Sequence, residues 1–196
     1  RKEKDIWKSL KKIFTKYKID CLINNAAIDH KSDNKKLFNF TKTELKDWKK
    51  ILNVNINGIF LLSKHCCRHF EKNYKGNIVN VASTYGIVAP DNSIYSEIKN
   101  FKKHLAYPTS KSAVIGFTKS LASYYKNTNI RVNSISPGGI YLGQSKKFIK
   151  NYSKKTIIGR MARLEEIVNS IKFLISDDSS YMTGSNLIVD GGWTAI

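Results

Sequence analysis

The alternation of helical and strand-like patterns along the chain constrains the fold more than any other feature of the sequence. Apolar residues recur at helical spacing near residues 4–18, and short, mostly apolar runs with strand character follow at intervals. The predicted strands are 19–24, 78–81, 130–135 and 186–190. The helices predicted between them make each crossover long enough for parallel pairing. The sequence therefore predicts an α/β fold, with one parallel sheet between two layers of helices.

Two features mark where the longer helices begin. Residues 41–44 read Thr-Lys-Thr-Glu, which is a capping box, and Phe40 and Leu45 are placed as a hydrophobic staple. We therefore expect a long helix from this point toward Phe70. Pro108 can occupy a first helical turn, where its missing N–H costs nothing, so a further helix is expected there.

Length and composition suit one globular domain over residues 1–196. There is no apolar run of transmembrane length and no secretory signal, so we expect no membrane partner. Three cysteines without disulfide-like spacing indicate a reducing compartment, the cytoplasm. Residues 65–69, His-Cys-Cys-Arg-His, suggest a metal cluster, but adjacent cysteines on a helix diverge and no second ligand pair recurs at zinc-site spacing. We expect packed or surface thiols there and no metal site.

The formal net charge of +19 raises the question of nucleic-acid binding. Most of the basic residues are lysines spread along the whole chain, whereas arginine, the residue of bidentate base and phosphate recognition, is scarce. No nucleic-acid-binding motif occurs. We therefore interpret the charge as solvated lysine faces and expect no nucleic-acid partner, although acidic small molecules such as phosphorylated substrates would be attracted.

Tyr107 and Lys111 form the pattern that carries chemistry. Their spacing places both side chains on one face of a helix. A tyrosine with a reference pKa of about 10 is a poor base at neutral pH, and a nearby ammonium lowers that pKa. Such a pair can pass a proton to or from a substrate oxygen while hydride moves at the adjacent carbon. Tyr95 and Lys99 share the spacing, but only Tyr107 is followed by a long helix and then a strand with Arg-Val-Asn at 131–133.

This arrangement resembles the short-chain dehydrogenase/reductase family, in which the tyrosine opens a helix that leads into an Arg-Val-Asn strand. Further family motifs occur in the same order along the chain. They are Asn24-Asn25-Ala26-Ala27, Asn53-Val54-Asn55-Ile56, Ile78-Val79-Asn80-Val81-Ala82-Ser83, Pro137-Gly138-Gly139-Ile140, Gly159-Arg160-Met161 and Val189-Asp190-Gly191-Gly192. Ala27 stands where the family usually has glycine. Each motif alone is weak, whereas the ordered set is specific and covers essentially the whole chain.

The resemblance implies a Rossmann-like, doubly wound sheet and an oxidoreductase that acts on a CH–OH group with NAD or NADP. It implies Tyr107 as general acid/base and Lys111 as the cation that lowers its pKa and holds the nicotinamide ribose. Ser83 would donate to the substrate oxygen, and Asn55 would hold a water that relays protons to Lys111. The implied cofactor-binding residues are Asn25, Ala26, Ala27, Tyr107, Lys111, Pro137, Gly138 and Ile140.

Two departures from the family pattern affect these expectations. No glycine-rich turn for a pyrophosphate precedes Asn24, so we expect an N-terminally truncated domain that lacks its first strands and exposes the edge of strand 19–24. The connection from Ser83 to Tyr107 is longer than usual because of an insertion over residues 90–105. The insertion contains Tyr95, Phe101, Lys102, Lys103 and His104. Loops of this kind set substrate specificity.

The stretch 83–91, the long insertion and the ending 189–196 are similar to bacterial flagellin-modification oxidoreductases, which act in the synthesis of unusual surface sugars. We therefore expect a small-molecule substrate with a secondary alcohol or ketone, with a sugar or nucleotide-sugar as a candidate. The basic segment 141–155 would suit a phosphate. A 3-oxoacyl-type reductase and a non-catalytic oligomerisation module stay open as alternatives. The family's helices around Asn55 and Tyr107 commonly form subunit interfaces, which implies a homo-dimer or homo-tetramer.

Overall fold

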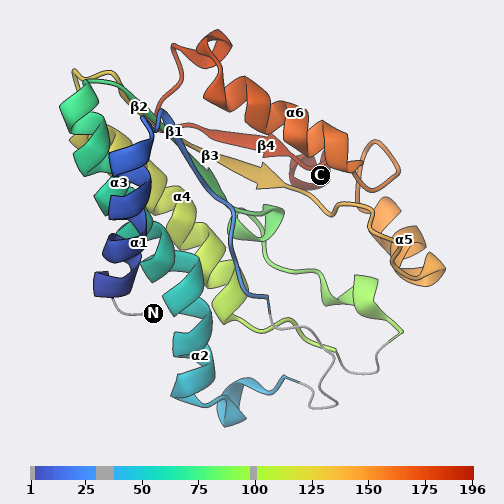
Figure 1. Cartoon of the computed structure of the whole chain (residues 1–196). Coiled ribbons are helices and arrows are strands. Elements are labelled where there is room, and N and C mark those ends of the chain that lie inside the picture. The colour runs from blue at the N-terminus through green and yellow to red at the C-terminus, as the bar shows by residue number, and fades with distance from the viewer. Residues whose placement is uncertain (1–2, 30–37, 98–100) are drawn as a thin grey trace.

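Four parallel strands form the centre of the molecule (Figure 1). The computed structural model describes residues 3–29, 38–97 and 101–196. Its strands are β1 (Cys21–Asn24), β2 (Gly76–Val81), β3 (Ile130–Pro137) and β4 (Asn186–Val189), in the spatial order β1-β2-β3-β4. Ile78 of β2 lies beside Leu22 on one side and beside Val132 on the other, and every pairing is parallel. The predicted parallel sheet is confirmed.

Helices cover both faces of the sheet, as the alternating pattern predicted. Figure 1 shows α1 (Glu3–Lys16), α3 (Ile59–Asn73) and α4 (Ala106–Tyr124) on one side and α6 (Leu164–Ile175) on the other. Neighbouring residues of a strand point to opposite faces, so Ile78 packs in the cluster with Phe70 of α3. Val79 packs instead with Leu174 of α6. The three-layer α/β/α architecture is therefore confirmed.

The remaining helices lie in the connections between these layers. α2 (Leu45–Leu52) leads into α3 through a π-helical stretch, Asn53–Gly58. α5 (Lys146–Ser153) lies in the basic segment, to which the sequence analysis assigned no helix. Short helical turns at Thr84–Gly86 and Asn92–Tyr95 lie in the long connection between β2 and α4. The π-helical stretch contains Asn55, and such bulges are frequent at functional sites.

The capping box expected over residues 41–44 is wrong. The Thr41 hydroxyl donates to Asn39 Oδ1 (2.9 Å) and the Thr43 hydroxyl to the Asn39 carbonyl (2.8 Å), so both threonines close a short turn that precedes the helix. α2 begins later, at Leu45. Phe40 and Leu45 are 67% and 63% exposed and form no staple. The motif predicted that a helix begins within residues 41–44, whereas in the folded chain the helix begins after the motif, at Leu45.

The parallel arrangement decides where a site can lie. All four strands end at the same edge of the sheet, where ligands bind in open α/β folds. Within the described ranges β1 pairs with β2 alone, and its Ile23 side chain is 42% exposed. Among the helices that the structure describes, none has the length and apolar character needed to cross a bilayer.

Candidate active site

Tyr107 lies in the first turn of α4, directly beside the end of β2. The close approach depends on Gly86, because a Cβ at this position would lie 2.8 Å from the Lys111 carbonyl group. The Ser112 hydroxyl also donates to the Gly86 carbonyl (3.0 Å). Ser83 begins the turn that contains Gly86, and its hydroxyl acts on the Tyr107 phenol to lower the pKa of that phenol. The structure thus brings Ser83 and Tyr107 together, as the ordered motifs predicted.

The environment of the Tyr107 phenol differs from the sequence expectation. Burial and the Asp29 carboxylate raise the pKa of Tyr107, while the Ser83 hydrogen bond and the Lys103 ammonium lower it. Burial prevails, so the phenol is protonated at neutral pH and can act as a proton donor. Lys111 had been expected to be the cation that lowers this pKa. In the structure the charged group that lowers it most is Lys103.

Lys111 is almost completely buried, with 4% of its surface exposed. Its ammonium donates to the Val81 carbonyl (2.7 Å) and lies 5.7 Å from the centroid of the Tyr107 ring. Burial lowers the pKa of Lys111 to about 8, although the Asp29 carboxylate opposes this shift. A buried ammonium has three donors, and Val81 uses one of them.

Asn55 is buried and ties two parts of the site together. Its Oδ1 accepts from the Ile28 N–H (2.7 Å), and its Nδ2 donates to the Ile28 carbonyl (3.0 Å) and to Ser110 Oγ (2.9 Å). The Ser110 hydroxyl in turn donates to the Tyr107 carbonyl (2.7 Å). The side-chain amide of Asn55 therefore fixes the loop after β1 against the first turn of α4.

The turn after β3 lies next to the same strand ends. The Thr84 hydroxyl donates to the Pro137 carbonyl (3.1 Å), and the Gly138 N–H donates to the Val189 carbonyl (2.9 Å). Gly139 is required because a Cβ there would lie 2.7 Å from the Tyr152 ring, whose hydroxyl accepts from the Gly139 N–H. Tyr152 of α5 thus fixes this turn, a contact that the sequence analysis did not foresee.

The residues after β1 that were predicted to bind the cofactor lie at the same edge of the sheet, but apart from the side chains described above. Asn25, Ala26 and Ala27 are exposed in the loop that follows the strand, where the Asn25 N–H donates to the Ile23 carbonyl (3.1 Å). This loop continues into Ile28, which Asn55 holds. Of the rival pair, Tyr95 lies against the Phe101 ring (4.3 Å between centroids), whereas Lys99 falls outside the described residues.

The His-Cys-Cys-Arg-His run is part of the packing between helices. Cys66 and Cys67 belong to the apolar core, and burial raises the pKa of their thiols to about 12 and about 11. His65 stacks on Trp7 and His69 stacks on Phe14, both residues of α1. Over residues 3–29, 38–97 and 101–196 no group of three or more His, Cys, Asp or Glu side chains could hold a metal ion.

Comparisons with known proteins agree with this geometry. The family model described as enoyl-(acyl carrier protein) reductase matches residues 1–194. Cyclopentanol dehydrogenase from Comamonas sp. is 34% identical over 184 residues, which are 91% of this chain and 67% of that protein. The post-translational flagellin modification protein A of Campylobacter coli is 33% identical over 186 residues, covering 86% of this chain and 72% of that protein.

A solved structure is similar over nearly the whole chain. The short-chain dehydrogenase from Leptospira borgpetersenii with bound NAD⁺ is 39% identical, with a TM-score of 0.83, and the match covers 97% of this chain and 70% of that one. The chain belongs to the short-chain dehydrogenase/reductase family. It is accordingly an oxidoreductase acting on CH–OH groups, and its cofactor is NAD or NADP.

The residues at the strand ends fit the nicotinamide end of such a dinucleotide. Among the residues that the structure describes, only the Val81 carbonyl accepts from the Lys111 ammonium, which leaves two donors that suit the hydroxyl groups of a ribose. Pro137 and Ile140 lie in the turn after β3, which Thr84 and Tyr152 hold in place. In this family NAD(P) supplies or accepts the hydride when it is bound.

The sequence analysis missed an ion pair in this short-chain dehydrogenase/reductase site. Lys103 Nζ contacts Asp29 Oδ2 and lies 5.1 Å from the centroid of the Tyr107 ring. Lys103 had been noted only as one basic residue of the insertion, and Asp29 had not been noted. No motif signals the pair, because the two residues lie far apart in the sequence and meet only in the folded chain.

Proposed function

We propose that this chain interconverts a secondary alcohol and a ketone on a sugar-linked substrate, with Tyr107 as the group that moves the proton. The observation that carries the proposal is the convergence of Ser83, Tyr107 and Lys111 where β2 ends and α4 begins. The Ser83 hydroxyl acts on the Tyr107 phenol and lowers its pKa, which supports a site where a hydroxyl and a phenol are available together. A substrate oxygen that contacts both would exchange its proton with one and gain a hydrogen bond from the other.

The reaction balances as a two-electron transfer. In reduction, the carbonyl carbon receives hydride from the reduced cofactor, and Tyr107 gives its phenolic proton to the carbonyl oxygen, which yields the secondary alcohol. In oxidation, the phenolate takes the hydroxyl proton back while the carbon gives its hydride to the oxidised cofactor. The raised pKa of Tyr107 keeps the phenol protonated at neutral pH, which suits proton donation.

Three further roles belong to this proposal. Lys111 binds the ribose and Ser83 donates to the substrate oxygen as charge develops on it. Asn55 holds the geometry through Ile28 and Ser110, and the water that relays protons to Lys111 is proposed to lie beside it. The cofactor contacts are proposed for Asn25, Ala26, Ala27, Tyr107, Lys111, Pro137, Gly138 and Ile140.

Two observations favour a sugar-linked substrate over an acyl chain. The match to the flagellin modification protein supports surface-sugar chemistry, whereas the description of the matching family model names an acyl-carrier substrate. α5 carries exposed Lys146, Lys147 and Lys150 next to the turn at Gly139, which suits an anionic sugar derivative. A 3-oxoacyl substrate is the alternative that the assay below includes.

The proposed setting is a cytoplasmic homo-oligomer. The three cysteines are free thiols, as expected in a reducing compartment. Phe60, at the start of α3, is 48% exposed beside the π-helical stretch that contains Asn55, and a second copy could cover it. Analytical ultracentrifugation of the chain and of Phe60→Ser measures this directly, because a subunit interface through α3 requires the variant to dissociate more readily.

The deciding experiment measures cofactor binding and turnover on the purified chain. NADH and NADPH are titrated against it by nucleotide fluorescence, followed by assays with secondary alcohols, sugar nucleotides and 3-oxoacyl thioesters. We expect saturable cofactor binding, turnover of a sugar-linked substrate, and a decrease in kcat of roughly 10²–10⁴-fold in Tyr107→Phe. Tyr124→Phe, on the exposed end of the same helix, is the matched control and should retain activity.

Each outcome has a definite meaning. A folded, cofactor-saturated chain in which Tyr107→Phe turns over as fast as the unchanged protein would remove Tyr107 from the chemistry. Turnover of 3-oxoacyl thioesters alone would replace the sugar-linked substrate with the acyl alternative. A folded chain that binds neither nucleotide would leave oligomerisation as its function.

A further inference from the structure

The insertion between Ser83 and Tyr107 places a second lysine inside the candidate active site. Lys103 is 9% exposed, and its ammonium contacts the Asp29 carboxylate. Three tyrosine rings surround this ammonium, with centroids 5.1 Å (Tyr107), 5.7 Å (Tyr95) and 5.9 Å (Tyr85) away. The Lys103 backbone N–H donates to Asn92 Oδ1 (2.8 Å), which fixes the segment that carries the side chain.

Burying the Lys103 ammonium costs free energy of desolvation, whereas its partner Asp29 keeps 37% of its side chain exposed. Lysine is almost never buried without a partner, and even a paired buried charge often contributes little net stability. An apolar side chain in place of Lys103 would fill the same space without that cost. The location of the charge, against the face of the Tyr107 ring, is therefore the feature that needs a reason.

We propose that Lys103, held by Asp29, is a positioning residue that stabilises negative charge on the Tyr107 phenol oxygen during proton transfer. The inference rests on the proposed catalytic role of Tyr107. A cation about 5 Å from the ring stabilises the phenolate relative to the phenol, both by direct attraction and through the ring. Asp29 acts in the opposite direction and more strongly, so the pair as a whole raises the pKa of Tyr107, and Lys103 limits that rise.

Lys111 and Lys103 have different roles in this arrangement. Lys111 is committed to the Val81 carbonyl at the end of β2 and keeps its remaining donors for a ribose. Lys103 approaches the Tyr107 ring more closely, at 5.1 Å against 5.7 Å for Lys111. Lys103 therefore supplies the local positive charge, and the insertion that carries it is part of the proton-transfer apparatus.

Several elements of the described chain contribute charged or titratable groups near Tyr107. They are Asp29 from the loop after β1, Ser83 from the end of β2, Tyr95 from a helical turn, Lys103 from the insertion and Lys111 from α4, while Tyr85 lies against Lys103. Burial acts to lower the pKa of Lys103, but Tyr95, Asp29 and Tyr107 outweigh it and raise that pKa, so Lys103 keeps its charge at neutral pH. The proposal needs this charge to persist.

The test replaces Tyr107 by 3,5-difluorotyrosine in the full chain. This phenol is more acidic than that of tyrosine, so it loses its proton at a lower pH, at which the protein is still folded. Its ¹⁹F signal reports the ionisation of this one side chain. We expect Lys103→Met to raise the titration midpoint by roughly one pH unit and Asp29→Asn to lower it by a similar amount. Lys103→Arg should restore the midpoint, and Lys102→Met, at an exposed neighbour in the same insertion, should leave it unchanged.

Unchanged midpoints in both Lys103→Met and Asp29→Asn would overturn the proposal. If Lys103→Met does not fold, Asp29→Asn decides, because the proposal predicts a lower midpoint in this variant, whereas a purely structural ion pair predicts no shift. The pH profile of kcat separates this inference from the proposed function. Midpoints that move without a matching move in the profile would leave Lys103 as the group that sets the charge of Tyr107 and would remove Tyr107 from the chemistry.

Discussion

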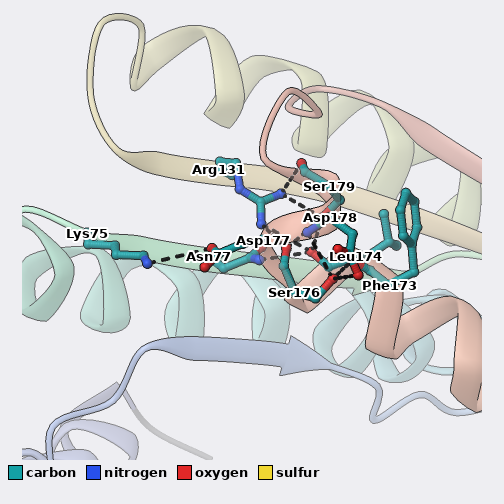
Figure 2. A network of polar contacts seen from close by, with 9 residues as sticks. All are labelled: Lys75, Asn77, Arg131, Phe173, Leu174, Ser176, Asp177, Asp178 and Ser179. Carbon is teal, nitrogen blue, oxygen red and sulfur yellow. Dashed lines mark hydrogen bonds and ion pairs between the residues drawn. The ribbon is translucent and has the colours of Figure 1, made fainter.

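The amino and carboxyl ends of the parallel sheet both hold buried polar side chains, but they use them differently. At the amino end, the Arg131 guanidinium donates to the carbonyls of Ser179 (2.8 Å), Ser176 (3.0 Å) and Met182 (3.2 Å), as Figure 2 shows in part. Asn77 Nδ2 donates to the Leu174 carbonyl (2.9 Å) in the same network. These donors serve carbonyls at the end of α6 and in the turn after it.

At the carboxyl end, the buried charged groups include an ammonium whose hydrogen-bond donors are not all used by the described residues. Within the described part of the chain Lys111 has one protein acceptor for three donors, and Lys103 lies among three tyrosine rings. Burial shifts the pKa of Tyr107 upward and that of Lys111 downward, because in both groups burial disfavours the charged form. Such a site costs stability and is ready to bind a partner that the chain itself does not provide.

This difference between the two ends of the sheet gives a criterion for interpreting a buried polar residue in this fold. A group whose hydrogen bonds go to the chain's own carbonyl and hydroxyl oxygens stabilises the structure, as the guanidinium of Arg131 does. A group left with unused donors or a perturbed pKa is a candidate for function, as Lys111 is. About 20 Å of β3 separates the two ends, so each can be changed without direct contact with the other.

Removal of Arg131 should give the largest change in stability. Arg131→Met leaves the carbonyls at the end of α6 without their donor, and we expect the free energy of unfolding to fall by about 2–4 kcal/mol. Urea unfolding at neutral pH measures this loss. Turnover per folded molecule should stay unchanged, because the site lies at the other end of the sheet.

The matched control for this variant is Arg163→Met. The side chain of Arg163 is 71% exposed in its pair with Glu166, so its removal should change the free energy of unfolding by less than about 0.5 kcal/mol. Equal losses in the two variants would mean that the network at the amino end contributes no more than an exposed pair. A loss of turnover per folded molecule in Arg131→Met would show that the two ends of the sheet are not independent.

Lys111→Met should have the opposite effect on stability. The pKa of Lys111 in the folded chain, about 8, lies below its ordinary value of 10.5, so folding disfavours the charged form. This penalty is fully present below about pH 8 and disappears as the pH rises toward 10.5. We expect Lys111→Met to be more stable by about 1–3 kcal/mol at pH 7 and the difference to shrink by pH 10.

Urea unfolding at the two pH values checks this, with Lys119→Met on the exposed face of α4 as the control. The same variant should bind NAD(P) more weakly and lose turnover. A Lys111→Met protein that is less stable at pH 7, or whose gain does not depend on pH, would contradict the interpretation of Lys111 as a costly functional residue.

The exposed ion pair between Asp91 and Lys155 should have the smallest effect. Its atoms lie 2.6 Å apart, but the side chains are 31% and 44% exposed. Hydrogen bonds from Lys155 and Ser93 lower the pKa of Asp91 to about 2, so its contribution is present above pH 3.8 and lost as the pH falls toward 2. A double-mutant cycle of Asp91→Asn and Lys155→Met should give a coupling of about 0.5 kcal/mol or less at pH 7. A larger coupling would show that this surface contact holds the insertion in place.

Some parts of this structure could be predicted because their signals are local. Apolar runs such as Ile78–Val81 alternate between two covered faces, and the spacing of Tyr107 and Lys111 on a helix is fixed by helical geometry. The start of α2 could not be predicted in the same way, because Thr41 and Thr43 bond to Asn39 instead of capping the helix. α5 was missed because its apolar face packs on Tyr95 and Trp193, partners that are distant in sequence.

The sequence by itself determined the α/β class, the parallel sheet, and the order of the residues around Ser83 and Tyr107, since each depends on neighbours within a few residues. Only the tertiary structure decided the charge environment of the site. Asp29 and Lys103 come from separate connections, and burial of Tyr107 depends on the packing of several elements at once. Desolvation and Coulomb interactions depend on distance in space rather than along the chain, so no pattern in the sequence encodes them.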